Sequence, residues 1–247
     1  MPGIAPAGGE VTWPLDEGVL GVVGVAPWAT LEFCRCFYGL VSARKDWDFP
    51  RVLLDINTKL PSRGRHLQLG ERDPSPYIAE TIAELALAGA TVAVVACNTA
   101  HVLFDRWSHG APIPVLNIVR EPVASARRSG ARRLLVLASA SLAQHNLYGQ
   151  EAERAGLACL PLAPDLQCIV NGLIETIKTN GSFSASDDGA IAKLVEHARM
   201  GQADTVLLGC TELTALRQHV ESAGLQVVDS NEALARAAYM AICPTAS

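Results

Sequence analysis

Two short motifs place a cysteine where an apolar run gives way to a helical pattern. The first is VVACNTAH at residues 94–101, and the second is VLLGCTEL at residues 206–213. Each apolar run is typical of a buried strand, and each cysteine stands directly after it. Cys97 and Cys210 therefore occupy matching positions, which indicates a pair with a shared role.

Four roles are open to these two cysteines. Cysteine packs well as a small buried apolar side chain, and then needs no function. A disulfide is disfavoured because the seven cysteines of the chain form no even framework of the kind found in small secreted proteins, which favours a reducing compartment. A metal site is disfavoured because the chain has neither C-x-x-C nor H-E-x-x-H, and no histidine is expected near Cys210 on a shared face. The fourth role is acid/base catalysis.

Acid/base catalysis would use the position of the cysteines at helix starts. Amide dipoles at a helix N-terminus favour the thiolate, so we expect the pKa of both thiols to be lowered. One thiolate and one thiol on opposite walls of a cleft could remove a proton from one face of a carbon and deliver another to the opposite face. Asn98, Thr99 and Thr211 offer donors suited to a carboxylate, although each is also an ordinary helix-capping residue.

The elements that must position these residues alternate between short apolar strands and longer helical patterns. Because the strands are apolar throughout, both faces of their sheets must be covered, which predicts an α/β fold with parallel sheets flanked by helices. The series is doubled, with Cys97 and Cys210 in corresponding places. We expect strands at 19–25, 51–56, 91–96, 114–119, 133–138, 204–209 and 225–229.

The doubling predicts two similar flavodoxin-like or Rossmann-like lobes related by pseudo-twofold symmetry, with the active site in the cleft between them. Ligands of such sheets bind beyond the carboxyl ends of the strands, where both cysteines stand. We expect a flexible N-terminal extension at 1–17, a first lobe from 18–119 with 226–247, and a second lobe from 120–225.

The motifs ACNTAH and GCTEL, in this order and spacing, resemble the aspartate/glutamate racemase family, whose members use two cysteines and no cofactor. The resemblance covers most of the chain from about Gly18 onward. The segment GVVGVAPWATLEFCRCF resembles the family's glycine-rich first strand and turn, but Val25 and Ala26 stand where Met and Gly are usual. At 137–148, LASASLAQHNLY keeps the hydroxyl of Ser139 but loses two others of the family's A-T-T-G-T, at Ala140 and Leu142.

Two further segments resemble the aspartate racemases in particular. INTKLPSRGRHL at 56–67 implies that Asn57 and Arg63 lie near the substrate, and IETIKTNGS at 174–182 implies the same for Lys178. By this resemblance Arg63 and Lys178 would hold a side-chain carboxylate, since a buried carboxylate needs a cationic partner. Glu212 could bind the α-ammonium group or cap a helix.

His101 could orient its neighbours or lie in solvent on a helix. The resemblance thus implies a cofactor-independent racemase that interconverts L- and D-aspartate, or a close acidic amino acid, with no metal. A maleate-isomerase-like carboxylate isomerase or a decarboxylase of the same superfamily stays open, as does a non-catalytic amino-acid-binding relative.

Composition limits the partners. The 247-residue chain has 49% hydrophobic residues, 18% charged residues and a formal net charge of −5, without a basic run that would indicate nucleic-acid binding. No export signal or membrane-spanning run is evident, so we expect a cytoplasmic protein that does not enter a membrane. The resemblance implies a homodimer.

Overall fold

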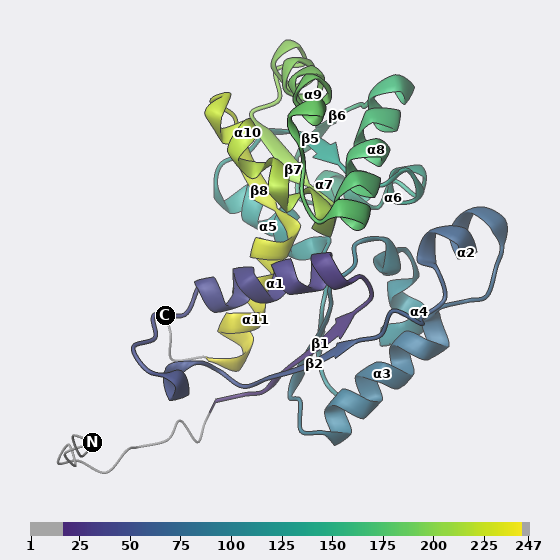
Figure 1. The fold of residues 1–247 in the computed structure, drawn as a ribbon, viewed down its shortest axis with the longest axis vertical. Helices are drawn as coiled ribbons and strands as arrows, with labels where there is room; N and C mark the ends of the chain where they lie inside the picture. The colour runs from purple at the N-terminus through teal and green to yellow at the C-terminus, as the bar shows by residue number, and fades with distance from the viewer. Residues whose placement is uncertain (1–16, 244–247) are drawn as a thin grey trace.

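The computed structural model describes residues 17–243, so the extension expected at 1–17 lies almost entirely outside the described residues. The described chain forms two four-stranded parallel sheets, one in each lobe (Figure 1). The strand orders are β2-β1-β3-β4 and β6-β5-β7-β8, so the two sheets have the same topology. The predicted doubling of an α/β unit is confirmed.

The strands match the predicted apolar runs closely. In the first sheet they are β1 (Leu20–Gly24), β2 (Val52–Ile56), β3 (Val92–Val95) and β4 (Val115–Leu116); in the second they are β5 (Arg133–Leu137), β6 (Ala158–Leu160), β7 (Thr205–Leu208) and β8 (Gln226–Asp229). Strand β6 was not among the strands expected from the sequence. Its residues are apolar, but this edge strand is only three residues long, is mostly exposed and stands directly before Pro161, which weakens the strand signal.

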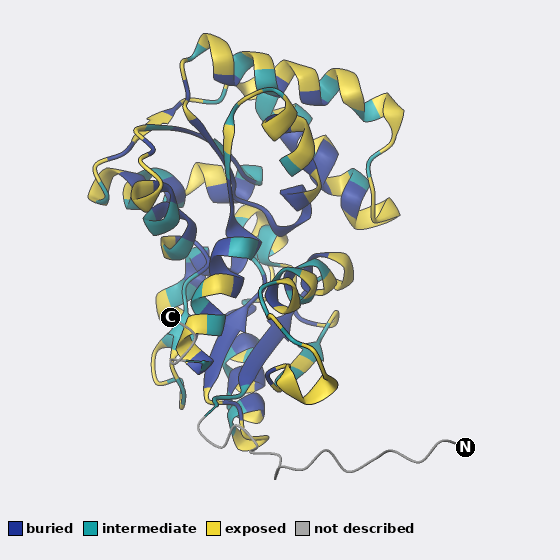
Figure 2. Ribbon diagram, turned by 90° about the vertical axis from the view of Figure 1, so that its left-hand side faces the viewer, coloured by how far each residue is buried: buried dark blue, intermediate teal, exposed yellow. Residues whose placement is uncertain are grey.

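Helices cover both faces of each sheet (Figure 2). In the first lobe, α1 (Pro27–Gly39) and α11 (Ser230–Ile242) cover one face, and α3 (Ser75–Leu87) and α4 (Phe104–Ser108) cover the other. In the second lobe, α5 (Arg120–Arg128) and α7 (Leu147–Arg154) lie opposite α8 (Pro164–Asn180), α9 (Asp188–Met200) and α10 (Arg217–Ser222). The short helices α2 (Arg63–Leu69) and α6 (Ala140–Gln144) lie between the lobes, where they contact each other.

The C-terminal segment corrects the predicted lobe boundary. Residues 226–229 were expected in the first lobe, but β8 pairs in parallel with β7 and belongs to the second sheet. Only α11 returns, packing against α1 (Figure 1). The carboxylate of Asp229 caps α11 by accepting hydrogen bonds from the amides of Asn231 (2.7 Å) and Glu232 (3.2 Å), so the chain crosses between the lobes at a fixed point.

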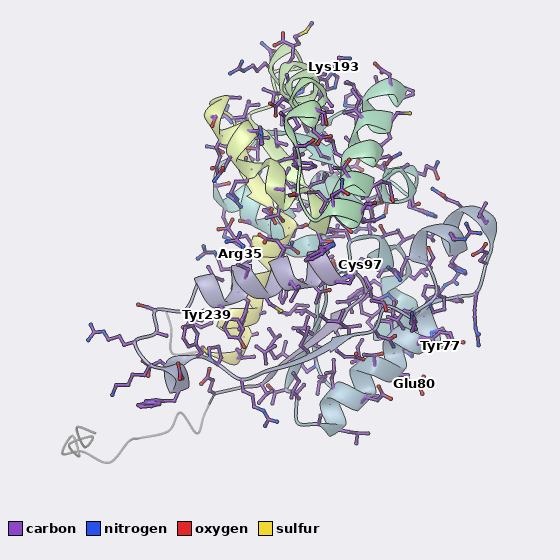
Figure 3. All side chains as sticks on the ribbon, viewed as in Figure 1. Arg35, Tyr77, Glu80, Cys97, Lys193 and Tyr239 are labelled. Atoms are coloured by element: carbon purple, nitrogen blue, oxygen red, sulfur yellow. The ribbon has the colours of Figure 1, made fainter. Side chains whose placement is uncertain are left out.

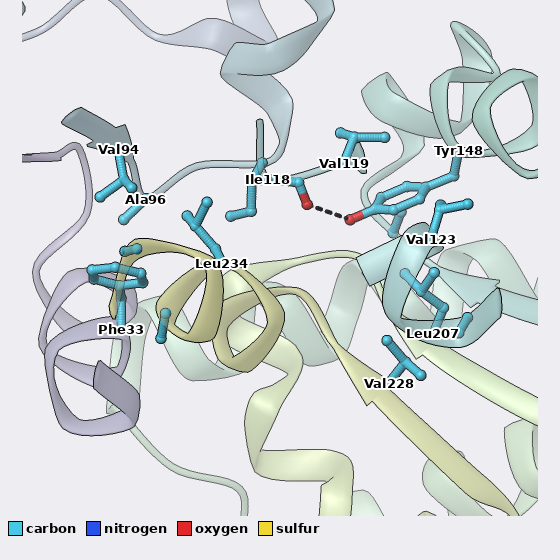
Figure 4. Close-up of a cluster of buried hydrophobic side chains, with 14 of the residues drawn as sticks. Phe33, Val94, Ala96, Ile118, Val119, Val123, Tyr148, Leu207, Val228 and Leu234 are labelled. Carbon is cyan, nitrogen blue, oxygen red and sulfur yellow. Dashed lines mark hydrogen bonds between the residues drawn. The ribbon is translucent and has the colours of Figure 1, made fainter. Parts of the chain in front are cut away.

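One apolar core joins the two lobes. Phe33, Val94 and Leu234 of the first lobe belong to the same buried cluster as Leu207 and Val228 of the second (Figure 4). Each lobe has a second core on its outer face. Because burial of apolar area is the main stabilising contribution, this shared core fixes the lobes relative to each other.

Candidate active site

Each cysteine lies at the same distance after the third strand in the order of its own sheet. Cys97 stands two residues after β3 and Cys210 two residues after β7. The helices that follow are 3₁₀ rather than α: η2 (Thr99–Leu103) and η4 (Thr211–Leu216). We call residues 97–99 the first cysteine turn and residues 209–212 the second cysteine turn. Figure 3 shows Cys97 at the junction of the lobes.

The two turns line one cavity of about 380 Å³ between the lobes. Nine of the ten predicted site residues lie on its wall: Cys97, Asn98, Thr99, Cys210, Thr211, Glu212, Arg63, Ser139 and Lys178. Asn57 does not line it. Its side-chain oxygen instead accepts a hydrogen bond from the Lys59 amide at 3.1 Å, which stabilises the turn after β2.

The thiol of Cys210 is buried and hydrogen bonded. It is 7% exposed, and its sulfur donates to the Oε2 atom of Glu212 at 3.0 Å. Burial raises the pKa of the Cys210 thiol well above its ordinary value, and the negative charge of Glu212 raises it further. The expectation of a lowered pKa is therefore wrong for Cys210, because desolvation and a nearby carboxylate outweigh the effect of one short helix.

Glu212 neither caps a helix nor lies in solvent. Its Oε2 atom also accepts a hydrogen bond from the Thr211 hydroxyl at 3.0 Å, so one carboxylate oxygen is the acceptor for two neighbouring side chains. The ammonium group of Lys178 lies close enough to contribute an electrostatic interaction. The carboxylate is thus placed to take up or return the Cys210 proton.

Cys97 is more exposed than Cys210, and its backbone carbonyl is hydrogen bonded to His101. His101 is 2% exposed, so it is not a solvated histidine. The Ile118 amide donates to its Nε2 atom at 3.3 Å, so its Nδ1 atom carries the proton and donates to the Cys97 carbonyl at 2.9 Å. Burial lowers the pKa of His101 to about 4, and the ring is neutral at pH 7.

The polar side chains between the turns connect the lobes. The hydroxyls of Thr99 and Ser139 are hydrogen bonded at 3.1 Å. The Asn98 amide is 2% exposed and donates to Ser230 at 3.0 Å, while it accepts from the Tyr148 hydroxyl at 2.6 Å. The side chain of Asn98 is therefore committed to protein partners.

The two predicted cations differ in their partners. Lys178 is hydrogen bonded to Glu175 at 2.8 Å; burial opposes its charge, but this bond and the charge of Glu212 raise its pKa. The guanidinium of Arg63 has no carboxylate partner among the described residues. It donates to the Pro61 carbonyl (3.2 Å) and the Val25 carbonyl (3.5 Å), and its Nε atom is buried without a hydrogen-bond partner there.

Several wall residues were missed from the sequence. Asn171, Ile174 and Glu175 share one face of α8 with Lys178, so helical spacing from that lysine could have found them. Gln68 and Ser141 gave no local signal. They meet across the cleft with a 2.8 Å hydrogen bond that joins α2 to α6.

The two losses noted at 137–148 have different places in the structure. Ala140 lies on the cavity wall, where its amide donates to Asn171 at 3.0 Å. Leu142 is 1% exposed in the shared core and does not line the cavity. The departure at Leu142 therefore changes packing, and only the one at Ala140 changes the wall.

All seven cysteines are free thiols, and residues 17–243 contain no cluster of three metal-binding side chains. None of the helices in that range is both long and apolar enough to cross a membrane.

Comparison with known proteins gives consistent matches. A family model described as Asp/Glu/Hydantoin racemase matches residues 21–238. The broad specificity amino-acid racemase RacX of Bacillus subtilis is 24% identical over 206 residues, which cover 83% of this chain and 86% of the relative. The glutamate racemase of Aquifex aeolicus is 29% identical over 161 residues, covering 60% of this chain and 57% of its own.

Solved structures share the fold. Picrophilus torridus aspartate racemase superposes with a TM-score of 0.81 at 25% sequence identity, covering 91% of this chain and 94% of that one. A glutamate racemase isoform of Bacillus anthracis, RacE1, superposes with a TM-score of 0.69 at 16% identity and shows likeness of fold alone.

Proposed function

Because the chain belongs to the Asp/Glu/hydantoin racemase family, we propose that it interconverts L- and D-aspartate, or a close acidic amino acid, with two cysteines and no cofactor. The observation that carries this proposal is that Cys97 of one lobe and Cys210 of the other line the same cavity. Two thiols that approach from different lobes suit a reaction in which a proton leaves one face of a carbon and arrives at the other.

The protonation of Cys210 gives the reaction a starting state. Its raised pKa keeps the sulfur protonated, so we assign Cys210 as the acid in one direction, which leaves Cys97 as the base in that direction. Cys97 takes the α-proton, and the Cys210 proton is delivered to the opposite face of the carbanion. In the reverse direction Cys210 must first lose its proton, and Glu212 already accepts its hydrogen bond at 3.0 Å.

Substrate carboxylates have two candidate positions. Backbone amides in the first turns of η2 and η4, with the hydroxyls of Thr99 and Ser139, suit the α-carboxylate, since N-terminal amides of helices lack partners within the helix. Arg63 suits the distal carboxylate because its guanidinium lies on the wall without an acidic partner in the described chain. Lys178 is already hydrogen bonded to Glu175, so it would contribute positive charge to the site rather than a direct bond to the substrate.

Aspartate as the substrate is supported by the aspartate-racemase-like segments that carry Arg63 and Lys178, and by the similarity to the Picrophilus enzyme. Free thiols throughout the chain suit a reducing compartment such as the cytoplasm. Other family relatives are named as glutamate and broad-specificity racemases, so the substrate must be tested against alternatives.

The test is incubation of the dialysed protein with single enantiomers of aspartate, glutamate and alanine, followed by chiral chromatography. We expect aspartate to reach a racemate fastest. Equal rates with alanine would contradict the role of Arg63. Conversion to an unsaturated dicarboxylate, or no reaction with any amino acid, would reject the racemase assignment.

A further inference from the structure

Tyr148 touches both cysteine turns, although it does not line the cavity. It is 3% exposed on α7 of the second lobe, and its hydroxyl donates to the Oδ1 atom of Asn98 at 2.6 Å. Asn98 directly follows Cys97. The same hydroxyl lies 3.4 Å from the Ile118 carbonyl (Figure 4).

The opposite side of the Tyr148 ring fits against the residue before Cys210. A β-carbon placed on Gly209 would lie 2.6 Å from the Cε2 atom of Tyr148 and 3.2 Å from two further ring atoms. These separations are shorter than van der Waals contact allows, so the ring reaches this position only because residue 209 is glycine. A single aromatic side chain therefore spans the distance between the two turns.

Further hydrogen bonds hold the first cysteine turn in place. His101 holds the Cys97 carbonyl at 2.9 Å, and Ser230 accepts from the Asn98 amide at 3.0 Å. The Thr99–Ser139 bond also links the turn to the segment after β5 of the second lobe, whereas Tyr148 positions it relative to Gly209. A hydrogen bond of 2.6 Å in a buried setting is short and directional, so it defines a position.

From these contacts we infer that Tyr148 is a positioning residue that sets the separation of the two cysteine turns. Proton transfer to opposite faces of one carbon tolerates little error in that separation, since misplacement by about 1 Å can cost on the order of 100-fold in rate. The consequence for catalysis rests on the proposed function. The positioning itself does not, and can be measured without a substrate.

The substrate-independent test is cross-linking with 1,3-dibromoacetone, in which each thiolate displaces one bromide and three carbon atoms bridge the two sulfurs. Peptide mass spectrometry then measures the Cys97–Cys210 link. We expect Tyr148→Phe to form this link at least about fivefold more slowly than wild type, because the ring remains but the bond to Asn98 is lost. Equal cross-linking rates in the two proteins would overturn the inference.

The matched control is Tyr239→Phe, which removes a phenol hydroxyl from α11 in a partly buried setting away from the cavity. It should cross-link like wild type. Gly209→Ala is a second variant, which should slow cross-linking by displacing the ring from its other side. The unfolding temperature of each variant shows whether a slower cross-linking rate comes from partial unfolding. If cross-linking slows only in variants that are partly unfolded, the positioning role is rejected.

A second measurement separates this inference from the proposed function. In deuterium oxide, Tyr148→Phe should lower kcat about tenfold and raise the ratio of α-deuterium exchange with retention to racemisation. Loss of folded protein would lower both rates equally and leave that ratio unchanged. If wild type racemises nothing while its cross-linking still depends on Tyr148, the proposed function fails and the positioning role stands.

Discussion

The first and second cysteine turns occupy equivalent places in two sheets of the same topology, yet their surroundings are different. Cys97 is partly exposed, and the side chain that bonds to its carbonyl is a buried histidine that stays neutral. Cys210 is buried beside the carboxylate of Glu212, which accepts its proton in a hydrogen bond. Equivalent backbone positions thus leave one sulfur partly exposed and bury the other beside a carboxylate, so the two halves of the proposed two-base reaction have different surroundings.

The largest effect should come from removing either sulfur. Cys97→Ala and Cys210→Ala should each lower racemisation at least about 1,000-fold, because neither thiol alone can serve both faces of the α-carbon. Each variant should still exchange the α-hydrogen of one enantiomer with solvent, and the two variants should select opposite enantiomers. Proton NMR of each enantiomer in deuterium oxide measures both outcomes. Substantial racemisation by either single variant would refute the two-base mechanism.

The next largest effect distinguishes Arg63 of the first lobe from Lys178 of the second by their contributions to kcat/KM. Arg63→Ala should lower kcat/KM for aspartate about 100-fold, since a buried carboxylate would lose its partner. Lys178→Ala should cost only about tenfold, because this lysine is already paired with Glu175 and partly exposed.

Arg65→Ala is the matched control for these two variants. Arg65 also lies on the wall, but its guanidinium is bonded to Glu71, so its removal should change kcat/KM little. Steady-state rates with aspartate and alanine test the order of the three variants. A larger loss at Lys178 than at Arg63 would reverse the assignment of the distal carboxylate.

A smaller effect tests why the two sulfurs differ. Glu212→Gln removes a negative charge that raises the pKa of Cys210, so that pKa should fall and the thiolate fraction at pH 8 should rise. Iodoacetamide reacts with the thiolate, so Cys210 should be alkylated about tenfold faster in the variant. In wild type this rate should rise steeply with pH between 7 and 9, because the pKa of Cys210 lies above that range.

Cys97 provides the reference within the same protein, because its alkylation rate should be the same in wild type and in Glu212→Gln. Glu175→Gln is the matched control, since it removes a cavity carboxylate that does not contact Cys210. Peptide mass spectrometry after short exposure gives the rate at each cysteine. An unchanged Cys210 rate in Glu212→Gln would mean that burial alone determines its protonation.

The smallest expected effect concerns stability on the Cys97 side. His101 has a folded-state pKa of about 4, below its unfolded value of 6.5, so the unfolded chain binds more protons at intermediate pH. The resulting stability is fully present above pH 6.5 and falls as the pH is lowered toward 4. Between pH 6.5 and 5.5 the loss should be about 1 kcal/mol.

Urea unfolding at both pH values measures this loss in wild type and in His101→Gln. The variant should be less stable at pH 7 but should lose less stability on acidification, since glutamine does not titrate. The other histidines remain in both proteins and their contributions cancel. Identical pH dependence in the two proteins would show that His101 is not buried as a neutral ring.

The sequence determined most of the fold because the relevant signals are local. Strands covered on both faces must be apolar along their whole length, which made β3 and β7 visible and placed Cys97 and Cys210 beyond them. Motif resemblance predicted Arg63 and Lys178 as site residues, and both line the cavity. The edge strand β6 was missed although its residues are apolar, because it is three residues long and ends at Pro161, which interrupts a strand pattern.

The tertiary structure decided what no local pattern could contain. The pKa of Cys210 depends on burial and on Glu212, and the helix-start rule alone gave the wrong direction. Strand β8 pairs with β7 because the folded chain brings these two strands side by side. The apolar pattern of β8 does not encode which strand it pairs with. The contact of Tyr148 with Asn98, 50 residues away, exists only because the shared core brings the two lobes together.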